Sequence, residues 1–255
     1  MLEIYAGETA LKSIQQQGFS PDLFCSFLGA SGGPKWFTLL GLDKYLFGEF
    51  FKGRQQPLNL IGSSAGAFRA ACFAQNNPVA AIERLAKNYS ETVYSNDTKP
   101  QPDEITAKAV ELLDELFGDS GADEIINNTV FKAHFIVAKC KGLVASENKL
   151  LQGAGLFNSF VRNSISRPLL NSQYERYIFQ HGQSDLAIYD PDNIATTSMA
   201  LSQRNIKAAL LASGSIPMVM QGIKDIADCP QGMYRDGGII DYHFDFNIQN
   251  EGLTL

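Results

Sequence analysis

The feature that most constrains the fold of this chain is a short apolar run that leads directly into a serine between two glycines. Residues 58–61 predict a buried strand, Gly62-Ser63-Ser64-Ala65-Gly66 follows, and the small residues after it predict a helix. This G-x-S-x-G pattern, placed between a strand and a helix, projects the serine hydroxyl from a tight turn above a helix N-terminus. Gly62 and Gly66 lack a Cβ, so the strand and the helix can approach closely. A turn that only caps a helix can share the five residues, but the flanking elements favour Ser64 as a nucleophile.

A second match to the same pattern, Gly29-Ala30-Ser31-Gly32-Gly33, also follows an apolar run. On the pattern alone, Ser31 competes with Ser64 as the nucleophile. The glycine pair after Ser31 favours a loop that displays backbone N–H groups, whereas the residues after Ser64 favour close helix packing. Acyl transfer needs both a nucleophile and donors for an oxyanion. We therefore expect Ser64 to attack, and residues 31–33 with Lys35 nearby to bind the oxyanion. A plain strand-to-helix connection is the alternative for this loop, and neither the dinucleotide nor the P-loop spacing is present.

A serine hydroxyl needs a base, and the chain has only three histidines. His134 lies within a predicted strand, which favours a structural role. His181 follows a strand at a glycine turn, which favours the surface. His243 lies after Asp236, so Ser64, Asp236 and His243 would follow the chain order of the triad in α/β-hydrolases.

Asp236 is itself a second candidate for the base. It ends a strand-like segment and precedes Gly237-Gly238, so its carboxylate can face a cleft with little steric cover. A carboxylate can accept the serine proton directly where burial raises its basicity. Asp-Gly-Gly is also common in β-turns, so the residues alone leave a turn, a dyad and a triad open.

Four segments, in this order, resemble the patatin-like phospholipase family over residues 23–241. They are Gly32-Gly33-Pro34-Lys35, Gly62-Ser63-Ser64-Ala65-Gly66, Ala212-Ser213-Gly214-Ser215-Ile216-Pro217 and Asp236-Gly237-Gly238. The resemblance implies a Ser64–Asp236 dyad in place of a triad, with Gly32, Gly33 and Lys35 as the oxyanion loop and its flanking cation. It also implies hydrolysis of phospholipids or other acyl esters through an acyl-serine, without a metal or a cofactor.

Two residues depart from the usual pattern of that family. Ser31 replaces the first of three consecutive glycines, and Trp36 stands where a glycine is frequent. These changes leave the dyad intact and bear on substrate preference, and they support the alternative hypothesis of a member that binds lipid or protein without catalysis. The resemblance also implies one domain over residues 1–255. The chain stops 19 residues after Asp236, as a minimal or shortened member would.

Strand-like and helix-like segments alternate along the chain, which predicts a three-layer α/β/α fold with a mostly parallel central sheet. The predicted strands are 2–6, 23–28, 58–61, 130–140 and 174–180. The predicted helices are 8–17, 34–51, the one after Ser64 to about Gln75, 78–94, 103–117, 150–170 and 206–212. Helices within residues 80–130 are candidates for a lid or a lipid-contact face. Apolar residues within 216–223 are candidates for the core or for contact with an acyl chain.

Composition limits the partners and the compartment. The formal charge of −6, without a basic block, argues against nucleic-acid binding and against strong attraction to anionic membranes, although local positive patches remain compatible with it. Cys25, Cys72, Cys140 and Cys229 are widely spaced, which favours free thiols in a reducing compartment. No signal-peptide pattern and no apolar run of membrane-spanning length is present. We expect a cytoplasmic protein whose contact with membranes is peripheral and transient.

Overall fold

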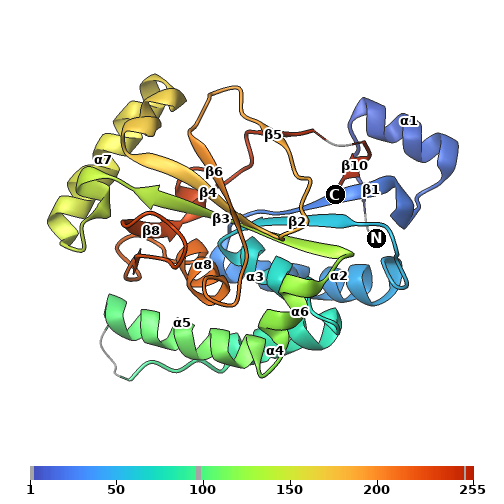
Figure 1. Cartoon of the computed structure of the whole chain (residues 1–255), viewed down its shortest axis with the longest axis horizontal. Helices are drawn as coiled ribbons and strands as arrows, with labels where there is room; N and C mark the ends of the chain where they lie inside the picture. The colour runs from blue at the N-terminus through green and yellow to red at the C-terminus, as the bar shows by residue number, and fades with distance from the viewer. Residues whose placement is uncertain (1–2, 96–98, 250) are drawn as a thin grey trace.

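A mixed β-sheet forms the centre of the computed structural model, which describes residues 3–95, 99–249 and 251–255 (Figure 1). Within these residues the sheet has eight strands, in the order β10-β1-β2-β3-β4-β6, with β8 beside β3 and β7 beside β8. The strands are β1 (Phe24–Gly29), β2 (Leu58–Ser63), β3 (Phe131–Cys140), β4 (Tyr174–Gln180), β6 (Thr196–Ala200), β7 (Ile223–Lys224), β8 (Met233–Asp236) and β10 (Leu253–Thr254). Four of the pairs are parallel, and β3 pairs antiparallel with both β4 and β8. The predicted α/β fold with a mostly parallel sheet is confirmed.

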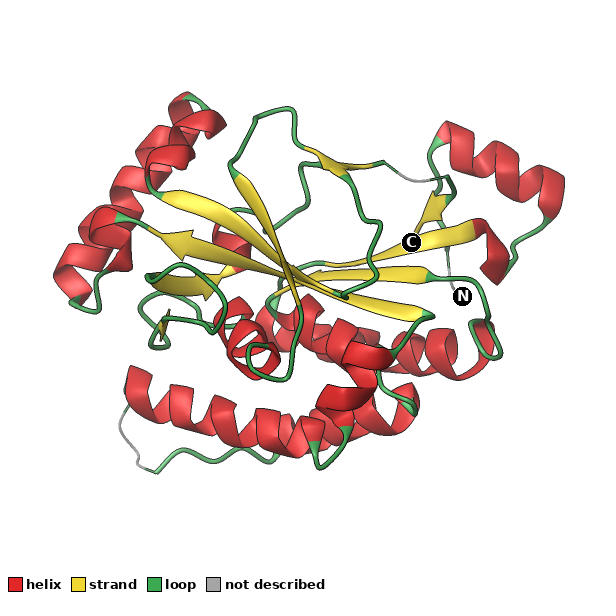
Figure 2. Ribbon diagram, viewed as in Figure 1, coloured by secondary structure: helices red, strands yellow, loops and turns green. Residues whose placement is uncertain are grey.

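Most helices lie on one face of this sheet (Figure 2). That layer contains α2 (Leu40–Tyr45), α3 (Ala65–Phe73), α4 (Pro78–Ser90), α5 (Pro102–Phe117), α6 (Gly121–Asn127) and α8 (Ile206–Ser213). The opposite face is covered by α7 (Lys149–Ile165) together with long connections, including the short strands β5 (Ile188–Tyr189) and β9 (Asn247–Ile248). Helix α1 (Glu8–Gln17) lies at the end of the sheet away from α7. The third layer is therefore partly extended chain, and none of the described helices is long and apolar enough to cross a membrane.

Strand β3 determines where β2 and β8 end. Its first half pairs in parallel with β2, up to Ser63 opposite Ile136. Its second half pairs antiparallel with β8, beginning with Asp236 opposite Val137. Because β4 occupies the other edge of β3, β2 and β8 must share one edge, and they run toward each other along it. The carboxyl ends of these two strands therefore meet opposite two consecutive residues of β3, Ile136 and Val137.

The main core lies between the sheet and the larger helix layer. It is rich in aromatic rings, such as Phe47 and Phe73, which stack with their centroids 3.7 Å apart. Asp43 on α2 and Arg69 on α3 form a buried two-point ion pair, with Nε–Oδ2 and Nη2–Oδ1 distances of 2.8 and 2.5 Å. These contacts fix α3 against its neighbours, and α3 is the helix that follows the serine turn.

Several local predictions are wrong. The strand predicted at 2–6 is irregular chain over residues 3–6, and residue 2 lies outside the described residues. The helix predicted at 34–51 is a 3₁₀ segment, then α2, then a π-helical turn. The helix predicted at 150–170 ends at Ile165, where Ser166 has extended backbone (φ −166°, ψ 125°). Arg167–Ser172 is a separate 3₁₀ segment with Pro168 in its first turn. All four cysteines are free, as predicted.

Candidate active site

The turn after β2 holds Ser64 in an unusual backbone conformation. Ser64 has φ 53° and ψ −125°, a region that residues with a Cβ rarely adopt. Helix α3 begins at the next residue, and the Ala67 N–H donates to the Ser64 carbonyl at 2.9 Å. Ser64 is only 5% exposed, at the base of a cavity. The strand–turn–helix geometry predicted around this serine is confirmed.

The two glycines of the turn are required by close backbone contacts. A Cβ on Gly62 would lie 2.3 Å from the carbonyl carbon of Gly66, and a Cβ on Gly66 would lie 1.7 Å from the carbonyl oxygen of Gly29. No rearrangement of side chains can relieve such contacts, because the facing atoms belong to the backbone. Strand β1, strand β2 and helix α3 are thus packed together directly beneath Ser64.

The last residue of α8, Ser213, and the segment after it join Ser64 and Asp236 to the same stretch of β3. The Ser213 hydroxyl donates to the Ile136 carbonyl at 2.8 Å and accepts from the Ser64 N–H at 3.1 Å. The Asp236 N–H donates to the Ser215 carbonyl at 3.1 Å. Ser213 is fully buried, so these bonds are shielded from water. In the sequence this segment is recognisable only as a motif. In the structure its hydrogen bonds position Ser64 and Asp236.

Asp236 lies in an environment that suits a base. It is 5% exposed, and burial raises the pKa of its carboxyl group to about 6. A side-chain hydrogen bond from Ser64 and the Gly238 N–H, which donates to Oδ1 at 2.7 Å, act in the opposite direction on this pKa. The carboxylate is therefore ionised at neutral pH, is more basic than an exposed aspartate, and interacts with the serine hydroxyl.

Gly237 and Gly238 are constrained by more than a β-turn. A Cβ on Gly237 would lie 2.2 Å from the Ile136 carbonyl oxygen. A Cβ on Gly238 would lie 2.5 Å from the Ser31 hydroxyl and 2.9 Å from Asp236 Oδ1. The pair lets the chain turn sharply against β3 while leaving Asp236 open toward Ser64.

The glycine-rich loop lies on the other side of Ser64. The Ser31 hydroxyl donates to the Ser63 hydroxyl at 3.0 Å, which ties this loop to the serine turn. Gly33 has φ 52°, a conformation that favours glycine. Within the described part of the chain, no hydrogen bond uses the backbone N–H of Gly32 or Gly33 as its donor. Two N–H groups are thus available at the wall of the cavity that contains Ser64 and Asp236.

Two cavities meet at Ser64. The dyad cavity, of about 340 Å³, is lined by Ser31, Gly32, Gly33, Ser64, Ile216, Pro217, Asp236, Gly238, Ile239 and Tyr242. The apolar cavity, of about 350 Å³, extends from Ser64 between α4, α5 and the loop after α8. Its walls include Trp36, Phe68, Ile105, Ala109, Leu112 and Met220. Trp36, the departure noted in the sequence, therefore contributes a wall of this second cavity.

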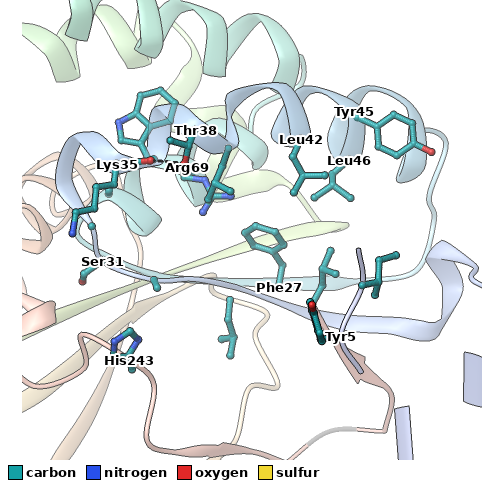
Figure 3. A pocket seen from close by; sticks show the side chains of 18 of the residues that line it. Tyr5, Phe27, Ser31, Lys35, Thr38, Leu42, Tyr45, Leu46, Arg69 and His243 are labelled. Carbon is teal, nitrogen blue, oxygen red and sulfur yellow. Dashed lines mark hydrogen bonds between the residues drawn. The ribbon is translucent and has the colours of Figure 1, made fainter. Parts of the chain in front are cut away.

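A third hollow, the N-terminal groove, lies beyond the glycine loop (Figure 3). Its volume is about 630 Å³. Ser31, Lys35 and His243 lie at one end of it, and Tyr5 and Tyr45 lie toward the other. Lys35 is exposed there and forms no ion pair among the described residues. The groove contains this lysine next to the glycine-rich loop, and its proposed role as a flanking cation stays a prediction.

The structure does not bring a histidine to the dyad cavity. His243 is exposed in the N-terminal groove, and no hydrogen bond of the described residues joins it to Ser64 or Asp236. His134 is buried in β3, with Nε2 2.6 Å from the Ser184 hydroxyl, and burial lowers its pKa to about 4. His181, predicted at the surface, is buried, and its Nδ1 accepts from the Gln183 N–H at 3.1 Å. That prediction is wrong because the residues after His181 lie against β3, where Lys132 Nζ donates to the Gln183 carbonyl at 2.8 Å.

The described residues contain no group of three or more His, Cys, Asp or Glu side chains that could hold a metal ion. In a comparison with protein-family models, the model of the patatin-like phospholipases matches residues 30–243. That match contains the glycine-rich loop, the serine turn, the segment after α8 and Asp236-Gly237-Gly238. Comparisons with curated proteins and with solved structures gave no match.

Proposed function

Since the chain belongs to the patatin-like phospholipase family, we propose that it is a lipid acyl hydrolase that uses a Ser64–Asp236 dyad. The observation that carries this proposal is the meeting of β2 and β8 on β3, which places Ser64 next to a buried carboxylate of raised pKa. Its substrates are phospholipids or other acyl esters, bound with the ester carbonyl in the dyad cavity. Release of fatty acid from a phospholipid by the purified chain is the direct assay.

In the proposed reaction, Asp236 accepts the proton of Ser64 as the hydroxyl attacks the ester carbonyl. The carbonyl oxygen gains negative charge, and the free N–H groups of Gly32 and Gly33 stabilise it. The alcohol leaves with a proton from Asp236, and an acyl-Ser64 remains. Water then loses a proton to Asp236 and attacks the acyl group. Asp236 returns that proton to the Ser64 oxygen as the bond to the acyl group breaks and the fatty acid leaves. The strained backbone at Ser64 holds its hydroxyl between the carboxylate and the glycine loop throughout.

Because the pKa of Asp236 is raised, we expect the plot of kcat/KM against pH to have an acidic limb. Protonation of the carboxyl group removes the base, so kcat/KM for a soluble ester is expected to be level above neutral pH and to fall about tenfold per pH unit below the pKa of about 6. A pH series on a short-chain nitrophenyl ester measures this, with circular dichroism at each pH to exclude unfolding. Since a histidine base would titrate in a similar range, the same series on His243→Ala is the control. Loss or displacement of the limb in that variant would assign it to His243 instead.

The apolar cavity is proposed to receive the acyl chain. It begins at Ser64 and its walls are almost entirely apolar. Substitution of Ala109, on the cavity side of α5, by tryptophan is expected to lower turnover of long-chain esters by about tenfold or more relative to short-chain esters, because the indole fills the space. The matched control is Ala107→Trp, since Ala107 is exposed on the same helix. Equal loss for short and long chains, or equal loss in the control, would place the acyl chain elsewhere.

A further inference from the structure

Helix α7 exposes most of its large apolar side chains, whereas an ordinary surface helix buries them. Its only fully buried residues are Gln152 and Gly155. Leu150, Phe157 and Ile165 are 85%, 69% and 72% exposed, and Leu151, Phe160 and Val161 are exposed as well. Leu150, Phe157, Val161 and Ile165 recur at helical spacing, so they form one stripe, here named the α7 stripe. A helix at a protein–water boundary normally directs such a stripe toward the core.

The orientation of α7 is fixed by specific polar contacts beneath it. The Gln152 side-chain nitrogen donates to the Ser146 carbonyl at 2.9 Å, and its side-chain oxygen accepts from the Met218 N–H at 2.7 Å. The hydroxyl groups of Ser159 and Tyr174 are 2.8 Å apart. At Gly155, a Cβ would lie 2.7 Å from the Val144 nitrogen. Rotation of the helix to bury its apolar side would break these contacts. The contacts therefore hold the stripe facing outward.

The charges on α7 differ from those of the chain as a whole. The full sequence has a formal charge of −6. Helix α7 contains no Asp or Glu, and it carries Lys149 and Arg162. Neither of these cations forms an ion pair within the described residues, where their hydrogen bonds go to the neutral side chains of Gln101 and Asn158. An outward apolar stripe can be buried among acyl chains, and cations without an ion pair can bind anionic headgroups. This combination fits the surface of an anionic lipid bilayer.

The position of α7 connects this surface to the proposed reaction site. The helix lies at the end of the sheet away from α1 (Figure 1). Residues of α7, including Leu156 and Phe160, line a cavity of about 540 Å³ together with Pro217, Gly238 and Ile239. Those last three residues also line the dyad cavity. A lipid leaving a surface against α7 would thus pass along a continuous wall to Ser64.

We propose that the α7 stripe docks this protein on an anionic lipid surface. The docking step itself does not depend on catalysis. Its consequence, delivery of a lipid ester from that surface to Ser64, rests on the proposed function. The stripe would enter the boundary between headgroups and acyl chains, while Lys149 and Arg162 pair with anionic headgroups.

The test is sedimentation with vesicles, using the full chain with Ser64→Ala so that no lipid is consumed. Vesicles of phosphatidylcholine with about one third phosphatidylglycerol are compared with phosphatidylcholine alone. The double change Phe157→Glu and Ile165→Glu is expected to weaken binding by about tenfold or more, since two apolar side chains can no longer be buried. Lys149→Gln with Arg162→Gln is expected to remove most of the preference for anionic vesicles, about fivefold for each cation. The matched control is Leu11→Glu, an exposed apolar residue on α1, which should bind as the parent does.

The same substitutions with Ser64 intact separate docking from catalysis. Turnover of a soluble short-chain ester should be unchanged in the double variant, whereas hydrolysis of vesicle lipid should fall with binding. A chain that binds vesicles in this pattern but hydrolyses no ester would contradict the proposed function and leave docking intact. Docking is overturned if the double variant binds vesicles as the parent does, or if Leu11→Glu weakens binding equally. It is also overturned if the parent is a dimer in solution that the double variant separates, because a second copy then covers the stripe.

Discussion

Ser64→Ala is expected to lower kcat for a short-chain ester by at least about 10⁴-fold, with little change in the fold. The reason is that the hydroxyl is the atom that would form the acyl intermediate, whereas the hydroxyl of Ser31, which lines the same cavity, is bonded to that of Ser63. Alanine fits the turn sterically, although it keeps the cost of the positive φ at this position. Steady-state kinetics, with thermal unfolding as a check on folding, measures the effect.

Two neighbouring serines are the controls for this variant. In the hydrogen bond from the Ser31 hydroxyl to the Ser63 hydroxyl, Ser63→Ala removes the acceptor and Ser31→Ala removes the donor. Each change should leave most of the activity, since the hydroxyl pair only ties the glycine loop to the serine turn. A loss in Ser31→Ala as large as that in Ser64→Ala would support the competing assignment, in which the second G-x-S-x-G match carries the nucleophile.

Asp236→Asn is expected to lower kcat/KM by at least about 10³-fold across neutral pH. Asparagine has nearly the same shape and can still accept from the Gly238 N–H, but it cannot take up the Ser64 proton. The comparison is His243→Ala, for which turnover within about twofold of the parent is expected, as for an exposed residue without a contact to the dyad. Strong loss in His243→Ala would favour a triad instead, in which Asp236 orients the histidine.

The sequence predicted the order of the main strands and helices because their apolar patterns are long and regular. The 10-residue strand β3 and the 13-residue helix α4 are examples. The strands β5, β7, β9 and β10 were missed, since each has two residues and no readable period. Strand β6 was missed as well, since Thr196–Ala200 is mostly polar, and so was the short helix α6. The strand predicted at 2–6 shows the converse error, in which a short apolar segment finds no partner strand over its described residues.

The sequence also singled out, through the glycine pairs and their neighbours, residues that the structure brings together around Ser64. It could not predict that Ser63 and Asp236 would pair with consecutive residues of β3, because pairing between distant strands leaves no local pattern. The role of Ser213 depends on the same pairing. Similarly, residues 150–165 were correctly predicted as helix, but which side of that helix faces water is decided by contacts of Gln152 and Gly155 with remote segments.

The proposed reaction requires the Asp236 carboxylate to activate the Ser64 hydroxyl. A fluorophosphonate probe reacts covalently with activated serines, so mass spectrometry of the labelled chain identifies the nucleophile directly. We predict labelling at Ser64 that persists in His243→Ala and is lost in Asp236→Asn. Labelling at Ser31, or labelling of Ser64 that depends on His243 and survives in Asp236→Asn, would contradict activation of Ser64 by Asp236.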